Sequence, residues 1–165
     1  MNQSSISVDS KLNHLIVFSI DEQRFALPIS VVKRVVRAVE ITVVPESPDI
    51  FLGVVNMEGD VIPVVHIRKR FNLPKRELEL SDRFIIAHTS TQTFAFVVDM
   101  INGVFELPEH QLITGKEFFP SFRRYVDGVI KDEDGMILIC NPDSFLSIEE
   151  KEVLKATMEN TGEIE

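Results

Sequence analysis

The stretch FLGVVNMEGDVIPVVHIRKRF, residues 51–71, sets the pattern from which the fold of this chain is inferred. Both of its arms are apolar and rich in β-branched residues, and Glu58-Gly59 lies in the short polar break between them. This pattern is typical of two strands joined by a tight turn. Residues 68–71 then resemble a single helical turn. The hairpin therefore carries an acidic residue at its tip and a histidine, His66, where its second strand ends.

Short apolar segments bounded by polar turns recur along the rest of the chain, and each is typical of a strand. We expect strands in residues 12–20, 24–29, 83–89, 93–100, 104–107, 125–132 and 135–141. The segment 30–45 is ambiguous, because its valines favour a strand whereas a helical turn could open it. A polar connection, residues 72–82, separates two halves that are each rich in short strands.

The C-terminal region predicts a helix. Ser147-Ile148-Glu149-Glu150 matches the capping box S-x-x-E, and Ile148, Val153, Leu154 and Met158 fit one face of about three helical turns. With about ten short strands and one terminal helix, the pattern indicates barrels or a sandwich. Long helices between strands are absent from the pattern, which argues against a parallel sheet.

Charge and composition exclude several classes of protein. Of 165 residues, 44% are apolar, as in an ordinary globular domain. The net charge of −9 falls entirely on residues 81–165, so a broad basic surface for nucleic acid is not expected. No apolar run is long enough for a membrane span, and the N-terminus lacks the pattern of a signal peptide. The single cysteine, Cys140, lies in an apolar run and excludes an intrachain disulfide, as expected for a cytoplasmic protein.

Catalytic and metal-binding patterns are missing from the sequence. None of the four histidines is spaced i, i+3 or i+4 from another, and no phosphate-binding loop, dinucleotide fingerprint or nucleophile elbow occurs. The acidic turn at residues 132–135 lacks the ligand spacing of a calcium loop. We therefore expect an interaction module without a cofactor rather than an enzyme.

Several short segments, in order, resemble the CheW family of bacterial and archaeal chemosensory adaptors. The resemblance covers about residues 14–158 and is carried by LIVFSIDEQRFALPISVVKRV, VVPESPDIFLGVVN, GDVIPVVHIR, FVVDMINGV and YVDGVIKDEDGMILICN. It implies a mainly β fold of two five-stranded β-barrel lobes that share a hydrophobic core, with a C-terminal helix. We accordingly expect a flexible tail at 1–11, a CheW-like domain at 12–158 and an acidic tail at 159–165.

The resemblance also implies a function. Members of the family couple chemoreceptors to a CheA-type histidine kinase and catalyse no reaction. The implied partners are the regulatory domain of the kinase, the cytoplasmic tip of a receptor coiled coil, and other CheW-like domains that close rings in the array. The implied place is a cytoplasmic or membrane-associated chemosensory array, without insertion into the membrane.

Individual contact positions can be carried over from the family pattern. The implied receptor-binding positions are Val32, Arg34, Gly53, Glu58, Gly59 and Val104. The implied kinase-binding or ring-closing positions are Ile29 and Phe118, while Ile113 stands where relatives can carry a basic residue. Each has an alternative structural reading: the glycines suit turns or close backbone approach, and the valines suit the core.

Two charges depart from the usual pattern together. The family usually has an acid in V-x-E-I and an arginine in N-L-R-G, where this chain has Arg34 and Glu58. We predict that Arg34 and Glu58 form an ion pair with swapped partners, which would act mainly on specificity. The alternative is two unrelated solvated charges.

His66 is a further departure, because it replaces the usual aspartate of I-D-L-R. It is either a structural histidine or a pH-sensitive contact. For function, two further readings stay open: a divergent family member that binds only receptor or only kinase, which Ile113 suggests, and a small-ligand-binding β-barrel or enzyme with a pocket between its lobes.

Overall fold

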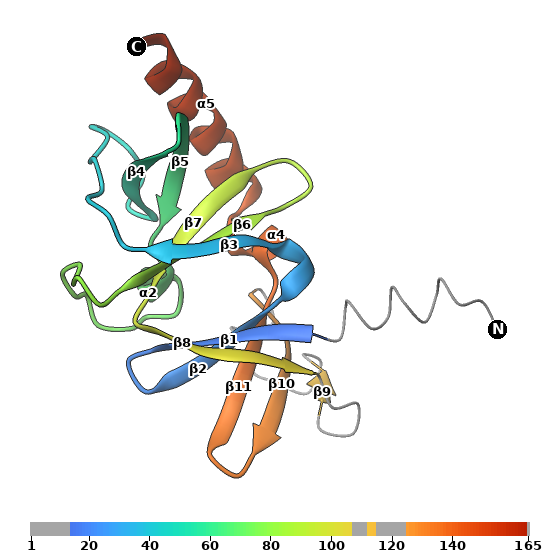
Figure 1. Cartoon of the computed structure of the whole chain (residues 1–165). Coiled ribbons are helices and arrows are strands. Elements are labelled where there is room, and N and C mark those ends of the chain that lie inside the picture. The colour runs from blue at the N-terminus through green and yellow to red at the C-terminus, as the bar shows by residue number, and fades with distance from the viewer. Residues whose placement is uncertain (1–13, 107–111, 115–124, 165) are drawn as a thin grey trace.

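The computed structural model describes residues 14–106, 112–114 and 125–164, and it folds them into two sheets with few helices (Figure 1). The first sheet has the strand order β8-β1-β2-β11-β10-β9. Its strands are β1 (His14–Ile20), β2 (Gln23–Pro28), β8 (Met100–Glu106), β9 (Leu112–Thr114), β10 (Val126–Asp132) and β11 (Gly135–Cys140). The predicted mainly β fold class is confirmed.

The second sheet has the strand order β3-β6-β7-β5-β4. Its strands are β3 (Val32–Arg37), β4 (Phe51–Met57), β5 (Asp60–Val65), β6 (Arg83–His88) and β7 (Thr93–Val98). The helices are the 3-10 turn η1 (Ile29–Val31), α2 (Ile67–Arg70), α4 (Pro142–Phe145) and α5 (Ile148–Ile164). The ambiguous segment 30–45 thus contains both expected elements, because a helical turn precedes a strand.

The two sheets repeat one arrangement of strands. In each, two antiparallel hairpins are joined by one parallel pair: β2 with β11 in the first sheet, and β5 with β7 in the second. A further antiparallel strand is added outside each, β8 on β1 and β3 on β6, and the short β9 adds a sixth strand to the first sheet. The parallel pairs need no long crossover helix, because hairpins distant in sequence supply the two strands.

The polar connection 72–82 does not divide the chain into its two lobes. Strands β6 and β7 follow it but pair with β3 and β5, which precede it. The chain instead crosses from the first sheet to the second through η1 and returns through Asp99, the residue between β7 and β8. The two strand-rich halves of the sequence are therefore not the two lobes, and the first sheet is assembled from both ends of the chain.

A core shared by both sheets lies between them. On β1, the side chains of Phe18 and Ile20 face this shared core, while Leu15 and Val17 face a smaller core of the first sheet alone. On β6, Ile85 faces the shared core and its neighbours face a core of the second sheet. Strands that are buried on both faces need continuous apolar runs, as in LIVF and FIIA. Each buried side chain of this size contributes about 1.5–3 kcal/mol.

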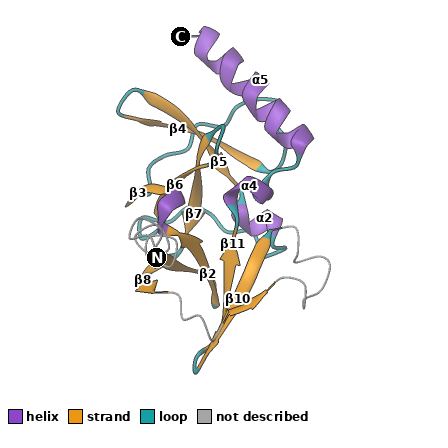
Figure 2. Cartoon of the chain, turned by 90° about the vertical axis from the view of Figure 1, so that its right-hand side faces the viewer, coloured by secondary structure: helices purple, strands orange, loops and turns teal. Residues whose placement is uncertain are grey.

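Helix α5 begins with the predicted capping box. The backbone N–H of Glu150 donates to Ser147 Oγ at 3.0 Å, and the N–H of Ser147 donates to Glu150 Oε1 at 2.8 Å. Leu154 on its inner face is buried in the shared core. The helix continues to Ile164, beyond the expected three turns, so the acidic residues after 158 extend a helix where a tail was predicted. We call the part built on the first sheet the first lobe and the part built on the second sheet the second lobe. Figure 2 shows α5 running beside the second lobe, at the end of the molecule away from β10 and β11.

A cluster of charged side chains holds the second crossing between the sheets. Asp99 accepts hydrogen bonds from Arg68 on α2, from Arg76 in the connection 72–82, and from the backbone N–H of Asp21 in the β1–β2 turn. Asp82 accepts from Arg76 at 2.6 Å and is almost fully buried. The cluster therefore ties both sheets, α2 and the polar connection to the point where the chain changes sheet.

The charged states of this cluster are stabilised by its own contacts. Burial alone would lower the pKa of Arg68 and raise that of Asp99, but their hydrogen bonds outweigh burial and shift both pKa values the opposite way. The hydrogen bond to Asp82 is the main cause that raises the pKa of Arg76. Each charge in the cluster is thus compensated, as a buried ionic group requires.

Candidate functional site

The tip of the β4–β5 hairpin presents Glu58 to solvent. Met57 pairs with Asp60, so Glu58 and Gly59 form a two-residue loop, with φ angles of +55° and +93°. Two positive φ values are typical of a type I′ turn, whose twist matches the flanking strands. Asn56 Oδ1 accepts a hydrogen bond from the N–H of Gly59 at 3.0 Å. This turn geometry fixes where the backbone of Glu58 lies.

Arg34 approaches Glu58 from the opposite edge of the same sheet. Its Nη1 lies 3.4 Å from Glu58 Oε1, and the two side chains are 40% and 81% exposed. Because β3 is one edge strand and the β4–β5 hairpin forms the other edge, the pair spans the opening between the two edges of the sheet. The structure thus brings together two of the predicted site residues. An ion pair this exposed contributes about 0–1 kcal/mol, so its effect on a partner remains a prediction.

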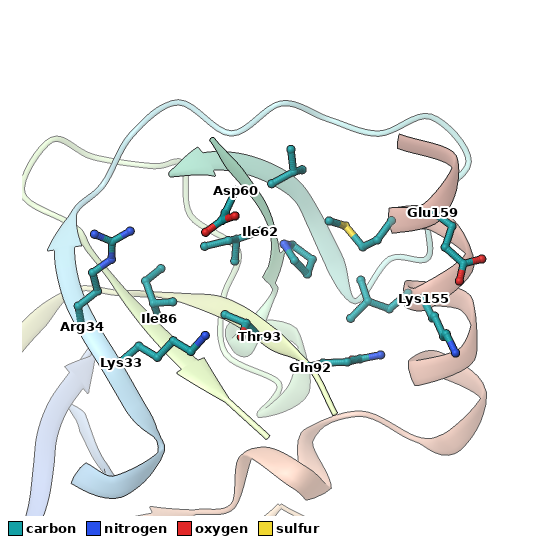
Figure 3. A pocket seen from close by; sticks show the side chains of 13 residues that line it. Lys33, Arg34, Asp60, Ile62, Ile86, Gln92, Thr93, Lys155 and Glu159 are labelled. Carbon is teal, nitrogen blue, oxygen red and sulfur yellow. The ribbon is translucent and has the colours of Figure 1, made fainter. Parts of the chain in front are cut away.

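A groove of about 590 Å³ lies beside this pair, between β3 and α5 (Figure 3). Its floor is apolar and includes Ile62 and Pro63 from β5 and Ile86 from β6. Lys33 and Arg34 stand on the β3 side, and Lys155 and Glu159 stand on the α5 side. An apolar floor with charged walls suits a partner segment that is apolar on one face and polar at its flanks.

The space beside Gly53 is filled by another segment of the same chain. A Cβ atom at this position would lie 2.2 Å from the backbone oxygen of Thr42, and its φ is +146°. Thr42 also exchanges two backbone hydrogen bonds with Val54, at 2.9 and 2.8 Å. The close approach that a glycine permits is thus to the chain's own segment, whereas no atom lies within 4 Å of a Cβ built at Gly59.

Val32 and Val104 belong to a different face from Arg34. Val32 packs against the shared core, and Val104 is in register with Ile16, a residue of that core, so its side chain points to the same side of its sheet. Arg34 is in register with Ile86, which faces the core of the second sheet. The predicted receptor-binding positions therefore form two groups, one between the sheets and one beside the groove.

The predicted kinase-binding positions are only partly described. Ile29 begins η1, at the first crossing between the sheets, and is 38% exposed. Phe118 lies outside the described residues. Ile113 lies on β9 and is in register with Val129 of β10. Ile113 thus lies in the first sheet, whereas Ile29 lies in the turn that leads into β3, the strand that carries Arg34.

His66 lies at the end of β5 and is only 8% exposed. Its backbone N–H donates to Ile50 O at 2.7 Å, and its ring makes no cap hydrogen bond to α2. Burial lowers the pKa of His66, and the positive charges of Lys75, Lys69 and Arg68 lower it further. His66 is therefore neutral at pH 7 in the protein without a partner. It would become a positively charged contact only if a partner placed an anion next to its ring.

Sequence reasoning did not identify the other groove residues. Gln92 ends the β6–β7 turn, Thr93 begins β7 and Lys155 comes from α5, so no local spacing relates them to Lys33. A signal was present for the charged cluster, since Arg68 and Asp99 both lie in segments that carry the family resemblance. Their mutual contact, however, depends on the sheet order.

In the described part of the chain, no group of three or more His, Cys, Asp or Glu side chains is placed to hold a metal ion. Cys140 is fully buried, and burial raises the pKa of its thiol, which keeps it protonated. Within the described ranges, no helix has both the length and the apolarity needed to cross a membrane.

Comparison with known proteins gives consistent matches. The family described as CheW-like domain matches residues 14–150. The chemotaxis protein CheW of Thermotoga maritima is 30% identical over 130 residues, which cover 78% of this chain and 84% of that protein. The CheW protein of Bacillus subtilis is 27% identical over 136 residues, which cover 82% and 87% of the two chains.

A solved structure matches the fold as well. The scaffolding protein TtCheW from Thermoanaerobacter tengcongensis aligns with a TM-score of 0.76 and 31% sequence identity. The alignment covers 85% of this chain and 96% of that one. Similarity in sequence and in fold therefore extends over both lobes.

Proposed function

Because the chain belongs to the CheW-like domain family, we propose that it is a non-catalytic adaptor that couples chemoreceptors to a CheA-type histidine kinase in a signalling array. The relatives carry the name chemotaxis protein CheW, and the solved relative is called a scaffolding protein. An adaptor of this kind acts by binding, so it needs separate surfaces for its partners rather than convergent reactive groups. The array would be cytoplasmic or associated with the membrane.

The observation that carries this proposal is the separation of the two surfaces. The Arg34–Glu58 pair and its groove lie on the second lobe, while Ile29 lies at the border with the first lobe. Two surfaces at different places on one folded core would allow a receptor tip and a kinase regulatory domain to bind at the same time. We assign the receptor tip to both groups of predicted positions, Arg34 and Glu58 beside the groove and Val32 and Val104 on the side of the shared core. We assign the kinase to the surface around Ile29.

Exposed apolar side chains on β8 support the receptor side. Met100, Val104 and Phe105 are each more than half exposed on this edge strand. Val104 faces the side of the shared core, whereas Met100 and Phe105 are in register with Ser19 and Leu15 and point to the opposite face of the strand. Exposed apolar side chains on an edge strand are a typical mark of a contact site. Val104 is the position that the family pattern assigns to receptor binding.

Co-elution on a size-exclusion column tests the proposal. The full chain is mixed with the cognate kinase regulatory domain, with a receptor-tip fragment, and with both. A ternary complex is expected, and Val104→Glu should remove the receptor fragment but keep the kinase domain. Met136→Glu is a matched control, because Met136 is similarly exposed at 47% but lies on β11, in the distant β10–β11 hairpin.

The outcomes separate the alternatives. A complex with only one partner would favour the divergent member that binds only receptor or only kinase. Absence of a complex with either partner would overturn the adaptor function. A small molecule that remains bound through purification would instead favour the ligand-binding alternative.

A further inference from the structure

We propose that the groove between β3 and α5 receives an amphipathic helix of the receptor tip that carries a row of acidic residues, and that Lys33 and Lys155 bind this row. The inference rests on the proposed adaptor function and specifies the chemistry of the partner. It concerns residues that the family pattern does not assign, and it extends the contact beyond the Arg34–Glu58 pair.

The floor of the groove calls for an apolar partner surface. Ile62, Pro63 and Ile86 lie beneath it, and Leu154 and Met158 close it on the α5 side. A volume of about 590 Å³ accommodates several apolar side chains. Helices dock in such grooves through anchors at i, i+3, i+4 and i+7, which place several side chains on one line.

The three cationic side chains on the rim of the groove differ in whether they form an ion pair. Arg34 is paired with Glu58, whereas Lys33 and Lys155 make no ion pair with any of the described residues. Asp60 and Glu159 are the acidic members of the rim. Carboxylates of a partner would therefore be attracted to the lysines, since Arg34 is already neutralised.

The positions of these donors define one side of the groove. Figure 3 shows Lys33, Thr93, Gln92 and Lys155 following one side of the floor, while Asp60 lies across Ile62 from Thr93 and Gln92. The Nε2 of Gln92 donates to Lys151 O on α5 at 3.3 Å, which fixes the spacing of that side. Lysine and hydroxyl donors along one side of an apolar floor fit an amphipathic helix with acids along one flank.

Binding measurements with charge-reversed variants test the inference. The affinity of the full chain for a receptor-tip fragment is measured for wild type, Lys33→Glu and Lys155→Glu at low and high salt. Each variant should weaken binding about tenfold at low salt, and the difference should shrink at high salt. Lys131→Glu is the matched control, because Lys131 is an exposed lysine on β10 in the distant hairpin.

Site-specific labelling gives a second measurement. The only native cysteine, Cys140, is buried, so Thr93→Cys can be labelled selectively with a maleimide. The receptor fragment should slow labelling of Thr93→Cys and leave Lys131→Cys unaffected. Thermal melts of each variant verify that the chain is folded.

Four results would overturn the inference. If both lysine variants bind the receptor fragment with the affinity of wild type, the two lysines do not recognise acidic residues of the receptor. Unprotected Thr93→Cys in a formed complex would exclude the groove. Protection by the kinase regulatory domain, and not by the receptor fragment, would assign the groove to the other partner. If the wild-type chain does not bind the receptor fragment, the adaptor function itself fails and the inference falls with it.

Discussion

Arg68 Nη2 lies 2.8 Å from Asp99 Oδ1 and 2.9 Å from Asp99 Oδ2, so one guanidinium nitrogen contacts both oxygens of the carboxylate at the second crossing between the sheets. Arg68 follows a strand of the second sheet, and Asp99 precedes the first residue of β8 in the first sheet. The geometry of the crossing therefore depends on a charged contact that is 9% exposed on the arginine side.

Asp99→Asn should destabilise the protein by about 2–3 kcal/mol, because it leaves Arg68 and Arg76 partly buried with less compensation. Urea unfolding measures this change. The control is Asp132→Asn, which removes the partner of Arg24 in the exposed β10–β11 turn and should cost less than about 1 kcal/mol. Equal costs for both substitutions would contradict a special role for the crossing.

The same substitution should change the acid unfolding of the protein. Hydrogen bonds hold the pKa of Asp99 below its ordinary value of 3.8, so this carboxylate stabilises the fold above that pH and the stabilisation is lost as pH falls. In Asp99→Asn, the loss of stability below about pH 4 should be less steep. An unchanged slope in an acid titration followed by circular dichroism would argue against the assigned ionisation.

Gly53→Ala should destabilise the protein strongly. The added Cβ would meet the backbone oxygen of Thr42 at 2.2 Å, in a residue with positive φ, so a cost of about 2–4 kcal/mol is expected. Gly59→Ala is the matched control, because its φ is also positive but the surrounding space is open, and about 1 kcal/mol is expected. Similar melting temperatures for the two variants would contradict the close contact with Thr42.

A double-mutant cycle tests the Arg34–Glu58 pair. Arg34→Glu and Glu58→Arg should each weaken binding of the receptor fragment, while unfolding free energies change by less than about 1 kcal/mol because the pair is exposed. The double variant should recover part of the binding, because the ion pair is restored with opposite polarity. Additive single effects without recovery would show two independent charges.

His66 should make stability decrease when pH falls below its ordinary pKa of 6.5. Its pKa is lowered in the folded protein, so below that pH the unfolded chain takes up a proton first and unfolding is favoured. His66→Gln should remove this part of the pH dependence, which denaturant unfolding from pH 7 to pH 5 measures. NMR titration of His66 with and without the receptor fragment adds a second test, since an unchanged pKa on binding argues against a sensing role.

The sequence predicted most of the strands, because apolar segments and turn residues are local signals. The hairpin at residues 51–65, the capping box at Ser147 and the mainly β class were all inferred from neighbouring residues. The order of strands was not predictable in the same way. The pairing of β2 with β11 joins residues 24–26 to 137–139, and no local pattern encodes that contact.

The candidate site was likewise predicted only where its residues carry a local signal. The inverted charges Arg34 and Glu58 were visible because each departs from a short motif, and the predicted contact between them is present at 3.4 Å. The groove beside them was not inferred, since its walls come from β3 and α5 and its floor from strands between. The separation of Val32 from Arg34 onto two faces follows from the irregular register between these residues, which a sequence pattern does not specify.

The passage of the chain through both sheets also orders its assembly on the ribosome. A nascent chain that ends at Glu106 already contains every strand of the second sheet, but only β1, β2 and β8 of the first. Residues from Leu112 onward are needed to complete the first sheet and to supply Phe145 and Leu154 to the shared core. Because synthesis runs from the N-terminus, the strands of the lobe that carries the Arg34–Glu58 pair can pair first. One apolar face of β1 and β2 stays uncovered until the β10–β11 hairpin has been synthesised.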